Sequence, residues 1–262
     1  MYIMKNKITI LGAYGAKSDK GGSSAFLLNN ESVIDAGNLL VPLSQKSVDI
    51  ENVWLTHSHL DHISDMAFIL DNYHDKRTKT LKIYGLNSTL EALKKHFFNH
   101  VIWPDFSAIP LVNGKGMCIS YHPIECGKVY GLDASSTIEA IDTDHTVPSC
   151  GYGIEKDDSS VVITADTHSL TSVIEYVNRK QNVYALVVEC SFPVNMADMA
   201  KISKHFTPAY LFDALKPLEG QEIQIYINHI KPEYKTQICQ EIEVLKGSWD
   251  VTILEDGDII RF

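Results

Sequence analysis

One seven-residue segment limits the possible folds of this chain more than any other: Thr56-His57-Ser58-His59-Leu60-Asp61-His62. Three imidazoles and a carboxylate fall within six positions, directly after the apolar run Val53-Trp54-Leu55. Such a run is typical of a buried strand. Neutral imidazole and carboxylate bind zinc and other first-row divalent ions, whereas unpaired polar groups are costly to bury. The segment therefore predicts a metal site at the end of a strand.

The His-x-His-x-Asp-His pattern resembles the metal motif of the metallo-β-lactamase superfamily. This resemblance implies three more ligands downstream, each at the end of an apolar strand: a His, an Asp and a final His. All three are present, as His145 after residues 138–144, Asp166 after residues 161–165 and His229 after residues 223–228. Catalytic groups gather at strand ends because a rigid sheet positions them while the loops leave them accessible.

The resemblance also implies how the ligands divide between two divalent ions. The first ion would be held by His57, His59 and His145, and the second by Asp61, His62 and His229. The carboxylate of Asp166 would bridge the two ions. Zn²⁺ is the expected ion, with Mn²⁺ or Fe²⁺ as alternatives. Two such ions can activate a bridging hydroxide and stabilise displacement at phosphorus, so no protein nucleophile is needed.

Strand-like and helix-like segments alternate through most of the 262 residues, which favours two packed sheets flanked by helices. The resemblance implies more specifically an α/β fold, the metallo-β-lactamase-like αββα sandwich, with one hydrolase domain over residues 1–262. The expected strands are residues 8–11, 25–29, 32–35, 53–56, 81–84, 117–121, 137–142, 160–165, 184–189, 223–228, 251–254 and 259–261. The expected helices are residues 62–73, 88–100, 169–180, 196–204, 208–215 and 232–246.

Helix starts and one glycine-rich loop carry further local signals. Ser88 and Ser169 are expected N-caps, and Pro208 and Pro232 suit the first turn of a helix. Four glycines between positions 12 and 22 follow the first expected strand. They match neither phosphate-binding glycine pattern, so we interpret this loop as a turn between strands.

A second constellation bears on the substrate. Glu189 ends the apolar run 185–188, and His205 follows it by sixteen residues. This pairing resembles the phosphodiesterase branch of the superfamily, which includes tRNA 3′-processing endonucleases. The resemblance implies that His205 protonates the leaving oxygen while Glu189 orients its ring, with Asp61 as the third catalytic residue. General acid catalysis suits an imidazole held in one tautomer. Considered alone, His205 is equally consistent with the surface of a helix.

Four segments together resemble the class II cyclic-nucleotide phosphodiesterases: residues 57–63, 96–106, 145–152 and 228–232. The resemblance implies hydrolysis of a 3′,5′-cyclic nucleotide, cAMP or cGMP, to the 5′-nucleotide. The aromatic residues of segment 96–106 suit a nucleobase wall, but they suit a packed core or a dimer contact equally. Asp65 departs from the family pattern, which has a small residue there. This carboxylate either alters the metal environment or begins a helix.

The main alternative is an RNA or tRNA 3′-processing-type phosphodiesterase. The net charge of −10 and the lack of a long Lys/Arg run argue against a large nucleic-acid partner. A small anionic nucleotide can still bind, because two divalent ions reverse the local potential. A thioesterase or lactonase would share the metal motif without explaining the Glu189…His205 pairing. A binding module without activity is disfavoured, because every expected metal-site residue is present.

Localisation is predicted from what the sequence lacks. No run of eighteen or more apolar residues occurs, and residues 1–10 lack the apolar stretch of a signal peptide. The five cysteines are odd in number and form no Cys-x-x-Cys motif. We expect a cytoplasmic protein with reduced thiols and no membrane partner. A homodimer is left open.

Overall fold

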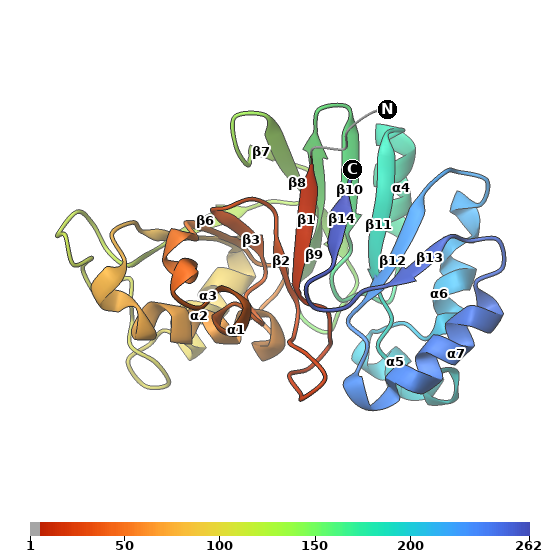
Figure 1. Cartoon of the computed structure of the whole chain (residues 1–262), viewed down its shortest axis with the longest axis horizontal. Helices are drawn as coiled ribbons and strands as arrows, with labels where there is room; N and C mark the ends of the chain where they lie inside the picture. Colours follow the sequence, from red (N-terminus) through yellow and green to blue (C-terminus); the bar gives the residue numbers. More distant parts are fainter. Residues whose placement is uncertain (1–5) are drawn as a thin grey trace.

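Side-chain alternation along the strands determines the layers of this molecule. In β11 (Val183–Glu189), Ala185 and Val187 join the core between two sheets, whereas Leu186 and Val188 pack in a core toward helices. A strand buried on both faces is typical of a sheet covered on both sides. The computed structural model describes residues 6–262 and contains two such sheets, each with seven strands (Figure 1).

Both sheets are mixed. The first has the order β14 (Ile259–Arg261), β1 (Lys7–Gly12), β2 (Ala25–Leu27), β3 (Ser32–Ile34), β4 (Asn52–Trp54), β5 (Leu81–Leu86) and β6 (Ile119–Ile124). The second has the order β13 (Val251–Ile253), β12 (Gln224–Asn228), β11, β10 (Ser159–Ile163), β9 (Ser149–Lys156), β8 (Ser136–Thr143) and β7 (Val129–Gly131). The strands β3 to β6 pair in parallel, as do β10 to β13, and the remaining pairs are antiparallel.

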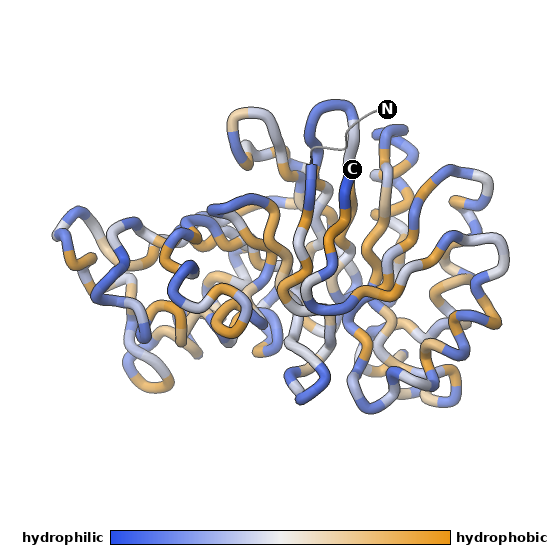
Figure 2. The backbone as a smooth tube through the Cα atoms, viewed as in Figure 1, coloured by the Kyte–Doolittle hydropathy of each residue, from blue (hydrophilic) through white to orange (hydrophobic). Residues whose placement is uncertain are grey.

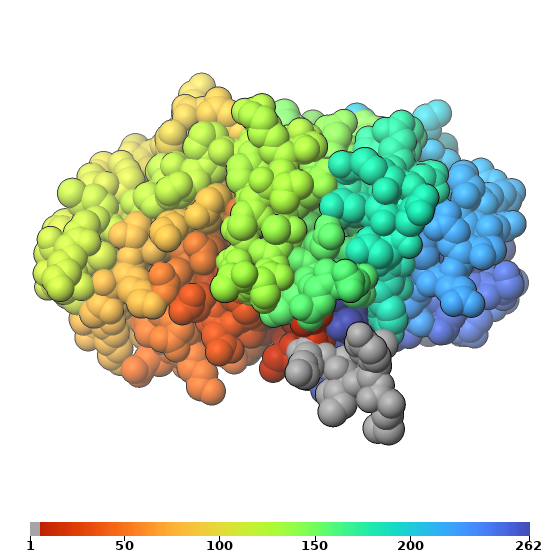
Figure 3. All heavy atoms as spheres, turned by 90° about the horizontal axis from the view of Figure 1, so that it is seen from above, coloured from red at the N-terminus to blue at the C-terminus, as the bar shows by residue number. Residues whose placement is uncertain are grey.

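Helices cover the outer faces of the two sheets. They are α1 (Leu40–Leu43), α2 (Leu60–Asn72), α3 (Asn87–His96), α4 (Thr171–Lys180), α5 (Ala197–Ser203), α6 (Pro208–Leu215) and α7 (Lys235–Leu245). Figure 3, seen from above, shows the N-terminal half on one side of the molecule and the C-terminal half on the other. The first and last strands, β1 and β14, pair in the middle, with Ile8 opposite Ile260.

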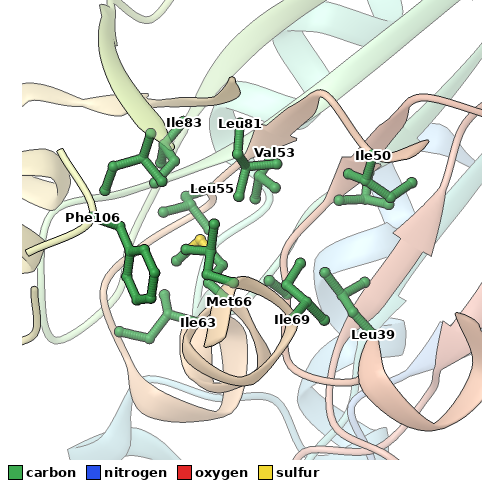
Figure 4. Packing of buried hydrophobic residues seen from close by; sticks show 14 of the residues in the cluster. Leu39, Ile50, Val53, Leu55, Ile63, Met66, Ile69, Leu81, Ile83 and Phe106 are labelled. Carbon is green, nitrogen blue, oxygen red and sulfur yellow. The ribbon is translucent and has the colours of Figure 1, made fainter. Parts of the chain in front are cut away.

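Three hydrophobic cores hold these layers together. One lies between the sheets, one joins the first sheet to α2 and α3, and one joins the second sheet to α4, α6 and α7. Figure 4 shows Ile63, Met66 and Ile69 of α2 turned toward Val53 and Leu81 of the first sheet. Hydrophobic residues follow the strands and the inner helix faces, while hydrophilic residues dominate the outer loops (Figure 2). The expected α/β sandwich is thus confirmed.

Several local predictions need correction. The strands β7 and β9 were not expected, and the helix expected over residues 88–100 ends at His96. Ser88 is not an N-cap, because α3 begins at Asn87 directly after β5 and leaves Ser88 inside the helix. Ser169 lies one position before the N-cap residue of α4. Pro208 does open α6, and Pro232 opens a 3₁₀ turn before α7.

All five cysteines are free thiols. Cys118, Cys150 and Cys190 are buried, as expected for core residues, whereas Cys126 is exposed. In the described part of the chain, no helix is both long enough and apolar enough to cross a membrane.

Candidate metal centre

The predicted metal ligands meet at one edge of the two sheets. His57 follows β4, His145 follows β8, Asp166 follows β10 and His229 directly follows β12. The other three lie at the start of α2, where His59 is the N-cap residue and Asp61 and His62 occupy the first turn. Neighbouring strand ends bring these side chains together although they are far apart in sequence.

The first predicted group is compact. One ligand atom from each of His57, His59, His145 and Asp166 lies within 4.8 Å of every other. His145 Nε2 is 3.2 Å from His59 Nδ1, and Asp166 Oδ2 is 3.8 Å from the Nε2 atoms of both His57 and His145. Three imidazoles and a carboxylate therefore converge on one point.

The second predicted group lies beside the first. Ligand atoms of Asp61, His62 and His229 also fall within 4.8 Å of one another. His229 Nε2 is 3.2 Å from His62 Nε2 and 3.5 Å from Asp61 Oδ2. Asp166 Oδ1 lies 3.2 Å from His229 Nε2, and Oδ2 lies 3.4 Å from His62 Nε2 and 3.8 Å from His57 Nε2, so this carboxylate borders both groups. That position suits the bridging role predicted for Asp166.

The chemistry of the cluster fits divalent metal ions. Two buried atoms within it, His57 Nε2 and Asp166 Oδ1, have no hydrogen-bond partner, which is unusual for buried polar atoms. Burial lowers the pKa of His57 well below its ordinary value, and burial likewise lowers the pKa of His145 to about 4. Neutral imidazole is the form that binds metal.

Three of the histidine rings are oriented through the nitrogen that faces away from the cluster. His62 Nδ1 is 2.6 Å from Asp35 Oδ2, His145 Nδ1 is 3.2 Å from the Lys204 carbonyl, and His229 Nδ1 is 3.0 Å from Ser191 Oγ. Partners of this kind hold metal-binding imidazoles in one tautomer and one orientation. The cluster is therefore preorganised for a metal.

Asp35 orients one of the predicted ligands, His62, and was not predicted from the sequence. Its carboxylate is buried, and it also accepts hydrogen bonds from the backbone N–H and Oγ1 of Thr56. Asp35 thus ties the end of β3 to the start of the His57 segment and to His62. The available signal was an Asp directly after the apolar strand residues Val33 and Ile34.

Left-handed backbone conformations gather around the site. Among the described residues, eight non-glycine residues have positive φ, and four of them belong to or adjoin the site: Asp35, Ala165, Lys204 and His229. Each such residue costs on the order of 1 kcal/mol or more, and such strain concentrates at functional sites. The strained backbone at these positions lowers the stability of the fold, and it orients the side chains toward the site.

The predicted pairing of Glu189 and His205 is present. His205 Nδ1 lies 2.8 Å from Glu189 Oε1, which also accepts from the Thr167 backbone N–H at 3.2 Å. Burial disfavours the charged form of His205, but attraction to Glu189 and their hydrogen bond outweigh it and raise the pKa of His205. His205 is only 6% exposed and lies between α5 and α6, so it is not a surface helix residue.

The Glu189–His205 dyad adjoins the metal-ligand cluster. One ligand atom each of Asp166, His205 and His229 lies within 4.8 Å of the others, and the His205 and His229 rings stack with centroids 5.4 Å apart. His205 Nδ1 is turned to Glu189, which leaves Nε2 as the nitrogen available to a substrate. The His168 Nδ1–H donates to the His205 carbonyl at 2.6 Å and supports that loop.

Ser191, which was not predicted from the sequence, connects the dyad to the cluster. Its Oγ lies 3.0 Å from Glu189 Oε2 and 3.0 Å from His229 Nδ1. Because a metal-binding His229 would use Nε2, its Nδ1–H would donate to Ser191, and the Ser191 hydroxyl would donate to Glu189. A single buried hydroxyl can therefore orient both residues.

The loop after β1 closes one side of the site. Gly15 packs so closely on His229 that a β-carbon there would come within 2.7 Å of the His229 carbonyl oxygen. The Lys231 ammonium donates to the Gly15 carbonyl and lies 3.9 Å from Asp61 Oδ2. This glycine therefore permits close backbone approach to the site, in addition to making the expected turn.

Asp65 has a structural role, which answers the question raised by its departure from the family pattern. It accepts hydrogen bonds from the backbone N–H groups of Leu39 and Leu40 at 2.7 and 2.8 Å, and it pairs with Lys17. None of the metal-ligand groups includes Asp65. The carboxylate anchors the start of α1 and the loop after β1.

Most aromatic residues of segment 96–106 belong to a core. Phe98 and Phe106 are buried in the core under the first sheet, and Phe97 and Trp103 pack against it. Val101 and Ile102 remain exposed. Core packing therefore accounts for this segment better than a nucleobase wall does.

Comparison with known proteins agrees with this geometry. A sequence model of the class-II cAMP phosphodiesterases matches residues 42–147. The crystal structure of unliganded yeast PDE1 superposes with a TM-score of 0.81 and 19% identity, covering 98% of this chain and 99% of that one. The metallo-β-lactamase fold protein YhfI from Bacillus subtilis superposes with a TM-score of 0.76 and 19% identity, covering 97% of this chain and 99% of that one.

The chain has the metallo-β-lactamase fold and resembles the class-II cyclic-nucleotide phosphodiesterases. A probable 3′,5′-cyclic-nucleotide phosphodiesterase of Yersinia pestis is 25% identical, with 98% of this chain and 89% of that protein aligned. The predicted αββα sandwich is confirmed, and so is the predicted resemblance to the class-II phosphodiesterases. The fold implies divalent metal ions, while the roles of individual ligands stay predictions.

Proposed function

We propose that this chain is a metal-dependent phosphodiesterase that hydrolyses 3′,5′-cyclic nucleotides to 5′-nucleotides. One observation carries the proposal: a buried His205–Glu189 dyad adjoins a cluster of seven predicted metal ligands. A general acid beside such a cluster suits an alkoxide leaving group, which needs a proton. The similarity to proteins named as cyclic-nucleotide phosphodiesterases supports the same assignment.

The proposal includes two metal ions, with Zn²⁺ preferred for this donor set. His57, His59 and His145 would hold one, and Asp61, His62 and His229 the other, with Asp166 between them. When bound, such a pair supplies an activated water and neutralises charge developing at phosphorus. The buried, preoriented imidazoles supply the fixed geometry that this requires.

His205 performs the proton transfer in this proposal. Its Nδ1–H donates to Glu189, and Nε2 carries the proton that the 3′ oxygen receives as its bond to phosphorus breaks. Glu189 stabilises the charged ring and fixes its tautomer, and Ser191 fixes Glu189. The 5′ oxygen stays on phosphorus, so the product is the 5′-nucleotide.

A turnover panel tests this function. The metal-loaded protein would be assayed with cAMP, cGMP, a cyclic dinucleotide, an aryl phosphodiester and a thioester. We expect the highest kcat/KM with a 3′,5′-cyclic mononucleotide. Preference for the thioester, or cleavage of a tRNA precursor without any cyclic nucleotide turnover, would contradict the proposal.

We also propose the domain organisation, the compartment and the oxidation state of the cysteines. Residues 1–262 would form one hydrolase domain in the cytoplasm, with the five cysteines reduced. Thiol titration under denaturing, non-reducing conditions should find most of them reactive, and stable pairing of four would contradict this setting. The exposed Val101 and Ile102 suit a homodimer contact, which sedimentation analysis would test.

A further inference from the structure

Phe192 is an aromatic residue that the packing of this protein does not use. Seven of the nine phenylalanines lie in or against one of the three cores, and only Phe68 and Phe192 do not. Phe192 is half-buried and follows the strand end that supplies Glu189 and Ser191. Because this ring lies outside the cores and beside the candidate acid, we expect it to contribute to binding more than to stability.

The neighbours of Phe192 show that its ring lies beside the Glu189–His205 dyad. Its ring centroid is 5.7 Å from that of His205, at an interplanar angle of 59°. Tyr234 flanks it at 6.2 Å and is itself packed against the core under the second sheet. The Phe192 backbone N–H donates to the Phe206 carbonyl at 3.2 Å, so the ring is carried by fixed backbone.

Lys231 adds a cation to the same corner. Its backbone N–H donates to the Ser191 carbonyl at 3.4 Å, which places it next to Phe192 in the fold. Its ammonium group reaches toward Asp61, at 3.9 Å from Oδ2. An apolar ring and an ammonium group thus border the dyad from neighbouring strand ends, and this combination matches a ligand with an aromatic ring and an anionic group.

We infer that Phe192 is the stacking platform for the nucleobase of the substrate. This inference rests on the proposed function, because it takes the oxygen next to His205 to be the ribose 3′ oxygen. The base is joined to that oxygen only through the ribose ring. Once the 3′ oxygen meets His205, the base therefore has to lie close to this imidazole, where Phe192 stands.

Phe68 is the rival platform, and the geometry disfavours it. It lies on α2 with its ring in a T-shaped contact with Trp103, at a centroid separation of 5.6 Å. Seven residues of helix separate it from Asp61, or about 10 Å of helical rise. Phe68 therefore serves as a matched control: a second phenylalanine outside the cores, 41% exposed, but about two helical turns beyond Asp61.

The test compares Phe192→Leu, Phe192→Tyr and Phe68→Leu on two substrates: cAMP and a ribose 3′,5′-cyclic phosphate that lacks the base. We expect Phe192→Leu to raise KM for cAMP about tenfold, within the range for loss of one stacked base. Its KM for the base-free substrate should stay unchanged. Phe192→Tyr keeps the ring and should behave like the wild type, and so should Phe68→Leu. Metal content and circular dichroism would verify that each variant is folded.

Three results would overturn the inference: equal changes on both substrates, no change on either, or a cAMP-selective loss in Phe68→Leu. Failure of the proposed function is distinguishable, because the wild type would then not hydrolyse cAMP. In that case calorimetry with 5′-AMP and ribose 5-phosphate tests the platform by itself. Phe192→Leu should weaken binding of 5′-AMP alone, and unchanged 5′-AMP affinity would refute base stacking.

Discussion

His205 Nδ1 and Glu189 Oε1 lie 2.8 Å apart in a buried pair at the edge of the metal-ligand cluster. Glu189 is fully buried, and its two oxygens also accept from the Thr167 N–H and the Ser191 hydroxyl. A carboxylate held at this many points has little freedom, so the imidazole that it contacts is held as well. In the proposed function this pair supplies the acid, so its predicted role is tested first.

Replacing His205 by Ala should lower kcat on a cyclic nucleotide by roughly a hundredfold or more, the usual scale for a positioned general acid. The interaction is made as the 3′ oxygen departs, so the transition state loses more than the bound substrate does. Steady-state kinetics and metal analysis would measure this, and metal content should stay unchanged. Lost metal would instead make His205 a ligand or a structural support.

The leaving group separates the acid role from phosphate binding. An aryl phosphodiester with an acidic phenol departs without a proton, so it should be much less sensitive to His205→Ala than cAMP is. Measuring kcat/KM for both substrates on both proteins gives the comparison. Equal losses would show that His205 binds phosphate and does not donate a proton.

Glu189→Gln should reduce turnover through the same imidazole, because the amide cannot stabilise the charged ring as the carboxylate does. Since the two residues act as a unit, the double variant with His205→Ala should cost less than the sum of the single losses. A double-mutant cycle in kcat measures this coupling. Additive losses would mean that Glu189 acts independently of His205.

The clearest failure of sequence-based prediction in the fold is β9. It contains Gly151 and Gly153, and glycine is depleted in strands. Packing explains both residues. A β-carbon at Gly151 would come within 2.6 Å of the Ile163 carbonyl oxygen, and one at Gly153 within 2.3 Å of the Tyr176 hydroxyl. Long-range contacts therefore require glycine in a strand whose local sequence disfavours a strand.

In the site, residues with distinctive side-chain chemistry could be predicted, and the residues that orient them could not. The seven predicted ligands, His205 and Glu189 come together as their motifs and the family resemblance indicated. Asp35 and Ser191 were missed because their contacts, to His62 and His229, span 27 and 38 residues. The strand-end position of Asp35 was a signal for a site residue, but neither a serine nor an aspartate indicates by itself which distant residue it contacts.

Ser191→Ala should weaken metal binding by about ten- to a hundredfold, the usual effect of removing a group that orients a ligand. The reason is the 3.0 Å contact between Ser191 Oγ and His229 Nδ1, which fixes the tautomer of His229. Competition with a chelator would measure the affinity. Ser160→Ala is the matched control, because Ser160 is fully buried on β10 but bonds to Asn182 and not to the cluster. Equal metal affinities of the two variants would show that Ser191 does not contribute to metal binding.

Asp166→Ala should lose metal from both groups of ligands, because Asp166 borders His57 of the first group and both His62 and His229 of the second. Elemental analysis of the purified wild type should give two divalent ions per chain, and the variant should hold fewer. A fully active enzyme with one ion, or a variant that keeps both, would contradict the bridging role.

In the proposed reaction, the bond between phosphorus and the 3′ oxygen of a cyclic nucleotide breaks beside His205. Phosphorus NMR would identify the products that the metal-loaded protein forms from cAMP. We expect 5′-AMP as the product, and almost none of it with His205→Ala over the same time. Formation of 3′-AMP, or no turnover of any 3′,5′-cyclic nucleotide by protein with both ions bound, would contradict the proposed reaction.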